Sequence, residues 1–129
     1  MGEMFTRGGV RVRRVYEPAE TADGTRVLVD RLWPRGMAKA DAPFSEWCRD
    51  AAPSNELRRW YGHQGERFEG FVERYRAELA DAAAQRALGR LRELADEGPL
   101  TLLTATKEVP ASHAAVLAEV LCEGSGERK

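Results

Sequence analysis

The sequence predicts an α/β fold in which helices pack on a small sheet. Two short, continuously apolar segments, at about 25–30 and 100–106, are typical of strands that are buried on both faces. Several other segments repeat their apolar residues at the spacing of an amphipathic helix. With 129 residues, of which 43% are hydrophobic, the chain has the size and composition of a single domain with its own core.

The N-terminal part is expected to begin with a flexible leader, residues 1–9, that ends in two glycines. A first strand follows at about 10–16, where apolar residues partly alternate with arginines, so that one face of the strand is more polar than the other. The connector to the strand at 25–30 is short for a parallel crossover, which commonly takes a dozen or more residues. The direction of the first strand relative to the second is therefore left open.

The polar loop after the second strand leads into an expected short helix. Asp41 is a candidate N-cap for this helix, and Pro43 would lie in its first turn. The helix would bury the aromatic side chains of Phe44 and Trp47. The dipeptide at 52–53, Ala-Pro, then ends it.

Four further helices are expected along the rest of the chain. Ser54, Asp81 and Ser112 are candidate N-caps, because their side chains can accept a hydrogen bond from the first helical turn. The expected helices cover 55–61, an apolar stripe over 68–79, 82–97 and a final segment that begins near 112. Glycines at 62 and 98 are typical helix ends. The single domain then spans 10–123, and residues 124–129 are expected to be a flexible tail.

Composition disfavours several classes of protein. The 20 basic and 21 acidic residues nearly cancel, giving a net charge of −1, whereas a generic nucleic-acid-binding protein carries a basic excess. A local basic patch is still compatible with this balance. No apolar run reaches the length of a transmembrane helix, and the N-terminus lacks the apolar core of a signal peptide. We therefore expect a cytoplasmic protein that does not associate with membranes.

The strand at 25–30 ends abruptly in charged residues. Asp30, Arg31, Trp33 and Arg35 crowd together there, and a proline and a glycine between and after them prevent the strand from continuing. In open α/β sheets, ligands usually bind outside the carboxyl ends of the strands. The sequence therefore predicts that these side chains form one wall of a cleft.

The exit of the strand at 100–106 and the start of the last helix complete the predicted site, provided that the two strands are parallel neighbours. Lys107 follows this strand, and His113 lies in the first turn of the helix, whose N-terminus offers free N–H groups and a positive dipole end. Arg31, Arg35 and Lys107 would hold a phosphate or a carboxylate, because the planar guanidinium group suits both.

Roles for the other candidates follow from their chemistry. Trp33 would stack on a flat ring of the ligand, and Asp30 or His113 would act as the catalytic acid or base. Arg58 and His63 are additional candidates for ligand binding. In the structural alternative, Asp30 pairs with a nearby arginine and Trp33 only fills core volume. No paired ligand spacing predicts a metal site, no nucleotide-loop or hydrolase motif is present, and the cofactor is left open.

The segment Arg26–Gly36 resembles the signature of the YeaO-like branch of the domain-of-unknown-function 488 family. The resemblance covers nearly the whole chain, through Ala52-Pro53-Ser54, Trp60-Tyr61-Gly62-His63, Tyr75-Arg76-Ala77-Glu78-Leu79, Leu100-Thr101-Leu102-Leu103 and His113-Ala114. It implies a compact α/β fold whose strands are mostly parallel in a Rossmann-like arrangement, and it implies no particular reaction. The chain departs from the family pattern at Thr104 and Ser112, where related sequences commonly carry Tyr and Asn or His.

Three functions are compatible with these features. The favoured one is a small enzyme or ligand-binding domain that acts on an anionic small molecule, nucleotide-like or phosphorylated, in the cleft at the strand ends. Whether the protein is an enzyme is left open. The alternatives are a nucleic-acid-binding module that uses a local Arg/Lys/Trp patch, and a structural or interaction protein without a small-molecule site. The oligomeric state is not predicted.

Overall fold

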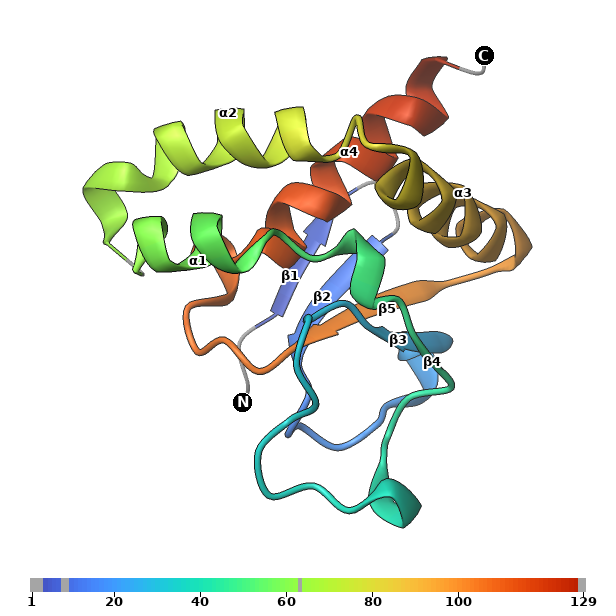
Figure 1. Cartoon of the computed structure of the whole chain (residues 1–129). Coiled ribbons are helices and arrows are strands. Elements are labelled where there is room, and N and C mark those ends of the chain that lie inside the picture. The colour runs from blue at the N-terminus through green and yellow to red at the C-terminus, as the bar shows by residue number, and fades with distance from the viewer. Residues whose placement is uncertain (1–3, 8–9, 63, 128–129) are drawn as a thin grey trace.

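The computed structural model describes residues 4–7, 10–62 and 64–127, and within them five strands form one sheet (Figure 1). The strands are β1 (Met4–Arg7), β2 (Val10–Arg14), β3 (Thr25–Leu28), β4 (Glu46–Trp47) and β5 (Leu100–Thr104). Their spatial order is β1-β2-β5-β3-β4; β1 is antiparallel to β2, and the other neighbouring pairs are parallel. The predicted α/β class with a mostly parallel sheet is confirmed, and the first predicted strand runs parallel to the second.

The α-helices in the described part of the chain are α1 (Asn55–Tyr61), α2 (Phe68–Glu78), α3 (Ala82–Glu97) and α4 (His113–Glu127). The three predicted N-caps, Ser54, Asp81 and Ser112, are confirmed by their contacts. The Ser54 hydroxyl accepts a hydrogen bond from the Leu57 N–H at 3.1 Å, and the Asp81 carboxylate accepts one from the first turn of α3. Gly62 ends α1 in the left-handed conformation, with φ of 52°. Short 3₁₀ turns lie at Thr21–Asp23, Lys39–Asp41, Arg49–Ala51, Gly65–Arg67 and Val109–Ala111.

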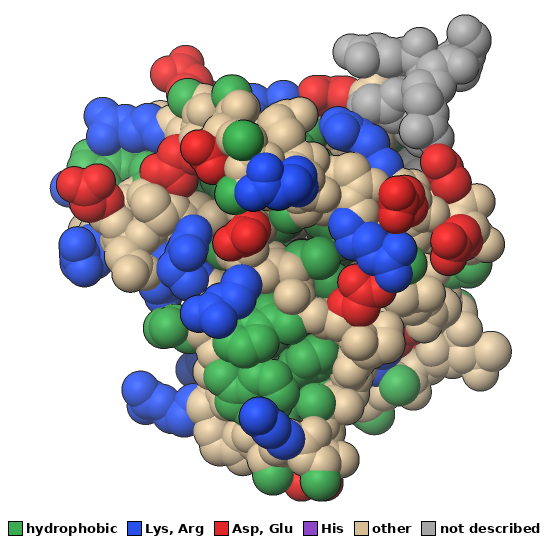
Figure 2. Space-filling model, turned by 45° about the vertical axis from the view of Figure 1, so that its right-hand side comes forward, with side chains coloured by type: hydrophobic (Ala, Val, Ile, Leu, Met, Phe, Trp, Pro, Cys, Tyr) green, Lys and Arg blue, Asp and Glu red, His purple; other side chains and the backbone are tan. Residues whose placement is uncertain are grey.

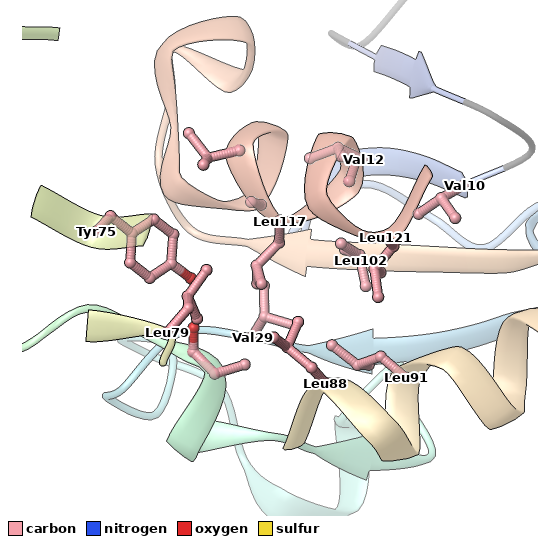
Figure 3. Packing of buried hydrophobic residues seen from close by; sticks show 14 of the residues in the cluster. Val10, Val12, Val29, Tyr75, Leu79, Leu88, Leu91, Leu102, Leu117 and Leu121 are labelled. Atoms are coloured by element: carbon pink, nitrogen blue, oxygen red, sulfur yellow. The ribbon is translucent and has the colours of Figure 1, made fainter. Parts of the chain in front are cut away.

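The helices pack against one face of the sheet and enclose the main core (Figure 1). Alternate strand residues point into this core, as expected from the two-residue period of a strand: Val10, Val12, Val27, Val29, Leu100 and Leu102. Figure 3 shows Leu88 of α3 and Leu117 of α4 on either side of Val29, with Leu121 of α4 next to Leu102 of β5. Tyr75 of α2 is fully buried beside them, and its hydroxyl donates a hydrogen bond to the Ala51 carbonyl. The core thus joins all four helices to the central strands.

Charged side chains, rather than helices, occupy much of the opposite face. Arg11 of β2 and Arg26 of β3 lie in one row across the sheet, on either side of Thr101 of β5. The carboxylate of Asp23, which is fully buried, joins them. Its Oδ1 lies 2.9 Å from Nη1 of Arg11, and its Oδ2 lies 2.9 Å from Nη1 of Arg13 and 3.2 Å from Nη1 of Arg26. The Thr101 hydroxyl donates to the Asp23 carbonyl at 2.8 Å.

The surroundings of Asp23 keep its carboxylate charged. Burial alone raises its pKa, but the Glu20 backbone N–H, which donates to Oδ2 at 3.0 Å, and the charges of Arg13 and Arg26 together lower the pKa below its ordinary value. Glu17 and Glu20 also lie 3.3 Å and 3.6 Å from nitrogens of Arg13. Three arginines therefore face three carboxylates, so that the buried charges are compensated.

A smaller apolar cluster completes this face near the carboxyl ends of the strands. Val15, Leu28 and Leu103 are fully buried there. Phe44 and Trp47, from the long segment between β3 and α1, pack against them. Loop residues rather than a helix therefore cover this end of the sheet.

The prediction of a short helix with Asp41 as its N-cap is wrong. A 3₁₀ turn ends at Asp41, and Glu46–Trp47 form the edge strand β4, paired in parallel with β3. The indole N–H of Trp47 donates to the Asp30 carbonyl at 2.7 Å. These partners are distant in the sequence, and they outweigh a local signal that consisted of a cap residue and a proline.

Regular secondary structure is present in both terminal segments, 1–9 and 124–129, that were expected to be flexible. Residues 4–7 of the expected leader form β1, which supplies hydrogen bonds to one edge of β2. The helix α4 extends to Glu127, into the expected tail. The sequence signal for β1 is the Gly-Gly dipeptide at 8–9 between two β-prone segments, 4–7 and 10–14, a pattern that is typical of a β-hairpin. Residues 1–3, 8–9 and 128–129 lie outside the described part of the chain.

The visible surface carries both signs of charge. Figure 2 shows a patch of hydrophobic side chains below the helices, with Lys and Arg side chains at its border. Most of the Asp and Glu side chains in this view lie higher, over the helices. This face therefore presents no broad basic surface of the kind that generic nucleic-acid binding requires.

Replacing the central carboxylate of the charged face tests its contribution to stability. We expect Asp23→Asn to lower the free energy of unfolding by about 3–5 kcal/mol, because it leaves buried guanidinium groups without their shared partner. Urea denaturation measures the change. The exposed Asp41→Asn is the matched control and is expected to stay within about 0.5 kcal/mol of the parent. Equal, small changes in the two variants would contradict a stabilising role for Asp23.

Candidate functional site

A cleft of about 380 Å³ opens where β2, β3 and β5 end and where α4 begins. Its walls combine the strand exits with the segment that leads into α1 and with the helices themselves. The lining residues are Tyr16, Asp30, Arg31, Leu32, Trp33, Pro34, Arg35, Ala52, Pro53, Arg58, Tyr61, Phe71, Ala105, Thr106, Ser112 and His113. The cleft thus lies at the carboxyl edge of the parallel strands, where ligands commonly bind in this class of fold.

Asp30 and His113, which the sequence placed in one site, are in contact. Nε2 of His113 lies 3.2 Å from Oδ1 of Asp30 and 3.0 Å from the Val29 carbonyl oxygen. Oδ2 of Asp30 accepts a hydrogen bond from the Ala105 backbone N–H at 2.8 Å. The buried Ser112, which precedes α4, accepts a hydrogen bond from the Ala115 N–H and so holds the start of the helix. The carboxylate therefore connects the exits of β3 and β5 to α4.

The same contacts set the charge of Asp30. Burial raises its pKa, but the hydrogen bond and charge of His113 lower it, and so do the Ala105 N–H and the Thr104 hydroxyl; the net pKa is below the ordinary value. The carboxylate is therefore ionised at neutral pH. In the structural alternative, Asp30 was expected to pair with a nearby arginine. The structure pairs it with His113 instead.

Arg31 lines the cleft, but it is tied to the protein backbone. Its Nε donates to the Pro53 carbonyl at 3.1 Å, and its Nη2 donates to the Ala52 carbonyl at 3.2 Å. These bonds attach the strand exit to the segment that precedes α1. Two of the guanidinium donors of Arg31 that were predicted to bind an anion are therefore used to bind the backbone of the cleft wall.

Trp33 is also held by neighbouring groups. Its ring packs edge-on against Phe44 and Trp47, with centroid distances of 5.4 Å to each. Its indole N–H donates to the Met37 carbonyl at 2.6 Å. The indole is half-buried and lines the cleft as part of an aromatic cluster.

The rim carries the exposed groups. Arg35 and Arg58 line the cleft from the strand exit and from α1, and both side chains are exposed. Nη1 of Arg58 donates to the Asn55 side chain at 3.1 Å. Tyr16, which follows β2, donates its hydroxyl to the Arg35 carbonyl at 3.1 Å. The charged lining therefore comprises three arginines and one carboxylate, and that carboxylate is already paired.

One of the predicted ligand-binding residues is not brought into the cleft. Lys107 is exposed after β5 and is not among the lining residues. His63 lies outside the described residues. Tyr16 was not predicted, because the direction of the first strand was left open and only a parallel β2 places its exit at this edge. Tyr61 and Phe71 were expected only as core residues, and they line the cleft as well.

In the described ranges 4–7, 10–62 and 64–127, no group of three His, Cys, Asp or Glu residues is arranged to hold a metal ion. No helix there is both long and apolar enough to cross a membrane.

Comparisons with known proteins place the chain in a family. Residues 9–129 match a family described as "Inactive DUF488-N3 subclade". An uncharacterized protein of Mycobacterium tuberculosis is 54% identical over 112 residues, which are 87% of this chain and 92% of that protein. The uncharacterized protein YeaO of Escherichia coli is 44% identical over 112 residues, 87% of this chain and 96% of its own. No solved structure matches the chain.

The lowered pKa of Asp30 predicts how its contribution to stability changes with pH. A carboxylate with a lowered pKa in the folded state stabilises the protein above its unfolded-state pKa, about 4, and this contribution is lost as the pH falls toward the lower folded-state pKa. We expect Asp30→Asn to be less stable than the parent by about 1–3 kcal/mol at pH 7, with a smaller difference below about pH 4. Urea denaturation between pH 7 and pH 3 measures this. A difference that stays constant with pH would contradict it.

Proposed function

The chain belongs to the family described as the inactive DUF488-N3 subclade, and from this premise we propose that it binds an anionic small molecule in the cleft without acting on it chemically. The observation that carries the proposal is the charge of the lining: Arg31, Arg35 and Arg58 face a single carboxylate, which His113 already pairs. A nucleotide or another phosphorylated compound has the charge that this lining favours.

Arg35 is the residue best suited to meet the anion. Its side chain is exposed at the rim, and its guanidinium group makes no hydrogen bond or ion pair with any residue that the structure describes. Arg58 lies on the same cleft and retains donors beyond its bond to the Asn55 side chain. Two guanidinium groups on one rim favour a phosphate or carboxylate, since each can donate two parallel hydrogen bonds.

Binding is favoured over catalysis by the state of Asp30. A general acid or base works best when its pKa lies near the operating pH, and here the pKa is lowered. Both carboxylate oxygens of Asp30 make structural contacts, one with the Ala105 N–H and one with His113, so the residue holds the strand exits and α4 together. The word "inactive" in the family description supports the same choice. The catalytic roles of Asp30 and His113 stay a prediction.

The size of the cleft favours a small ligand. Its volume of about 380 Å³ lies near the lower end of the range for small-molecule sites, about 300–1,000 Å³. The buried side chains of Tyr61 and Phe71 line it, whereas Arg35 and Arg58 are exposed at its rim. We therefore propose a ligand with an anionic end at the rim and a less polar part inside.

Ligand-induced thermal stabilisation tests the proposal. We expect adenosine monophosphate or ribose 5-phosphate to raise the melting temperature, because a ligand at about 100 times its Kd adds about 2.7 kcal/mol to the stability of the folded state. Arg35→Ala is expected to weaken binding about tenfold or more, since it removes hydrogen bonds between charged groups.

The control is Arg59→Ala, which removes an exposed arginine of α1 that does not line the cleft. The expected result is that Arg59→Ala keeps the parent's affinity while Arg35→Ala does not. No stabilisation by either phosphate compound, or an equal loss of affinity in both variants, would contradict the proposal.

A further inference from the structure

We propose that the ligand of this cleft carries a flat aromatic ring in addition to its anionic group, as a nucleoside monophosphate does, and that Tyr16 selects it by stacking. The inference rests on the proposed binding of an anion in the cleft. It adds a ligand class and a specificity-determining residue, neither of which follows from the charges alone.

Exposed apolar surface is concentrated at this cleft. Within the described part of the chain, the large hydrophobic side chains that are classed as exposed are Tyr16, 44% accessible, and Leu32, 60% accessible. Both line the same cleft. Isolated exposed apolar side chains are common, but two that converge on one concave site mark apolar contact with a ligand.

Tyr16 is held in a position that suits stacking. Its hydroxyl donates to the Arg35 carbonyl at 3.1 Å, which fixes the outer end of the side chain to the backbone at the exit of β3. The guanidinium carbon of Arg14 lies 5.1 Å from the centroid of the ring. Nη2 of Arg14 in turn donates to the Ala105 carbonyl at 3.2 Å, so the cation is anchored as well. One face of the ring is thus covered, and its accessible area is left for a ligand.

Trp33, which the sequence suggested as the stacking residue, is less suited to this role. Phe44 and Trp47 pack against it, and its indole N–H is used by the Met37 carbonyl. A ring that is already packed into a cluster offers less free surface than an exposed ring. The geometry therefore points to Tyr16 as the stacking platform.

The anion site and the ring lie on one lip of the cleft. The Tyr16 hydroxyl is bonded to the backbone of Arg35, the residue proposed to meet the anion. A ligand with its phosphate at Arg35 would therefore have the rest of the molecule within reach of Tyr16, and Leu32 adds apolar surface on the same rim. A flat base fits such surroundings better than a second polar group, because stacking and apolar burial both favour it.

Calorimetric titration with two phosphate compounds tests the inference. Adenosine monophosphate carries a flat base, and ribose 5-phosphate has the same anion without the base. We expect the monophosphate to bind the parent about tenfold more tightly, because stacking of a base on an aromatic side chain strengthens binding by about five- to 150-fold. Tyr16→Leu is expected to reduce this ratio of affinities about tenfold, whereas Tyr16→Phe keeps the ratio within about twofold because the ring remains.

The ratio separates the inference from the proposal on which it rests, and it also cancels any general loss of stability in a variant. If both compounds bind equally well to the parent, or if Tyr16→Leu leaves the ratio unchanged, stacking by Tyr16 is wrong while anion binding stands. An equal fall of the ratio in Tyr16→Phe would assign the effect to the hydroxyl and would also overturn the inference. If neither compound binds, the proposed function itself fails. Tighter binding of a single-stranded oligonucleotide than of the monophosphate would overturn the small-molecule assignment.

Discussion

The buried ion pairs of Asp23 are the constraint on which the sheet depends. Helices cover only one face of it, so the other face needs a different source of cohesion. Arginines from β2 and β3 supply it by converging on one carboxylate, and Thr101 of β5 binds the same residue through its carbonyl. Such a cluster stabilises the fold only when every charge is paired, since an unpaired buried charge is strongly destabilising. The turn between β2 and β3 is thereby fixed to the three central strands.

A second carboxylate, Asp30, has a related role at the carboxyl edge of the sheet. Its two oxygens connect the exits of β3 and β5 to the first residue of α4. Arg31 adds a connection to the segment before α1 through two backbone carbonyls. Asp30 and Arg31 therefore hold the cleft in shape, and the exposed side chains at its rim are available to bind a ligand. This division of roles is the physical basis for proposing a binding site rather than a catalytic centre.

Much of the site could be predicted from the sequence, and the parts that could not share a cause. The apolar run before Asp30 and its abrupt charged end were sufficient to predict a wall of the cleft. The placement of His113 at the same cleft followed from the expectation that the two strands are parallel neighbours. Tyr16 was missed because its place depends on the direction of β2, which is decided by pairing with β5, about 90 residues later in the chain. The expected roles of Arg31 and Trp33 were incomplete because their partners are backbone carbonyls and aromatic rings that no spacing rule identifies.

The sequence by itself determined the elements whose signals are local. Ser54 and Asp81 cap their helices and Gly62 ends one, because cap hydrogen bonds and left-handed backbone involve residues a few positions apart. Only the tertiary structure decided the identity of β4 and the pairing of Asp30 with His113. The sequence of Glu46–Trp47 carries no strand signal, and these residues form a strand because they pair with the edge of β3. Local hydrogen bonds and periodicity can be read along the chain, whereas sheet edges and charge partners exist only after distant segments have met.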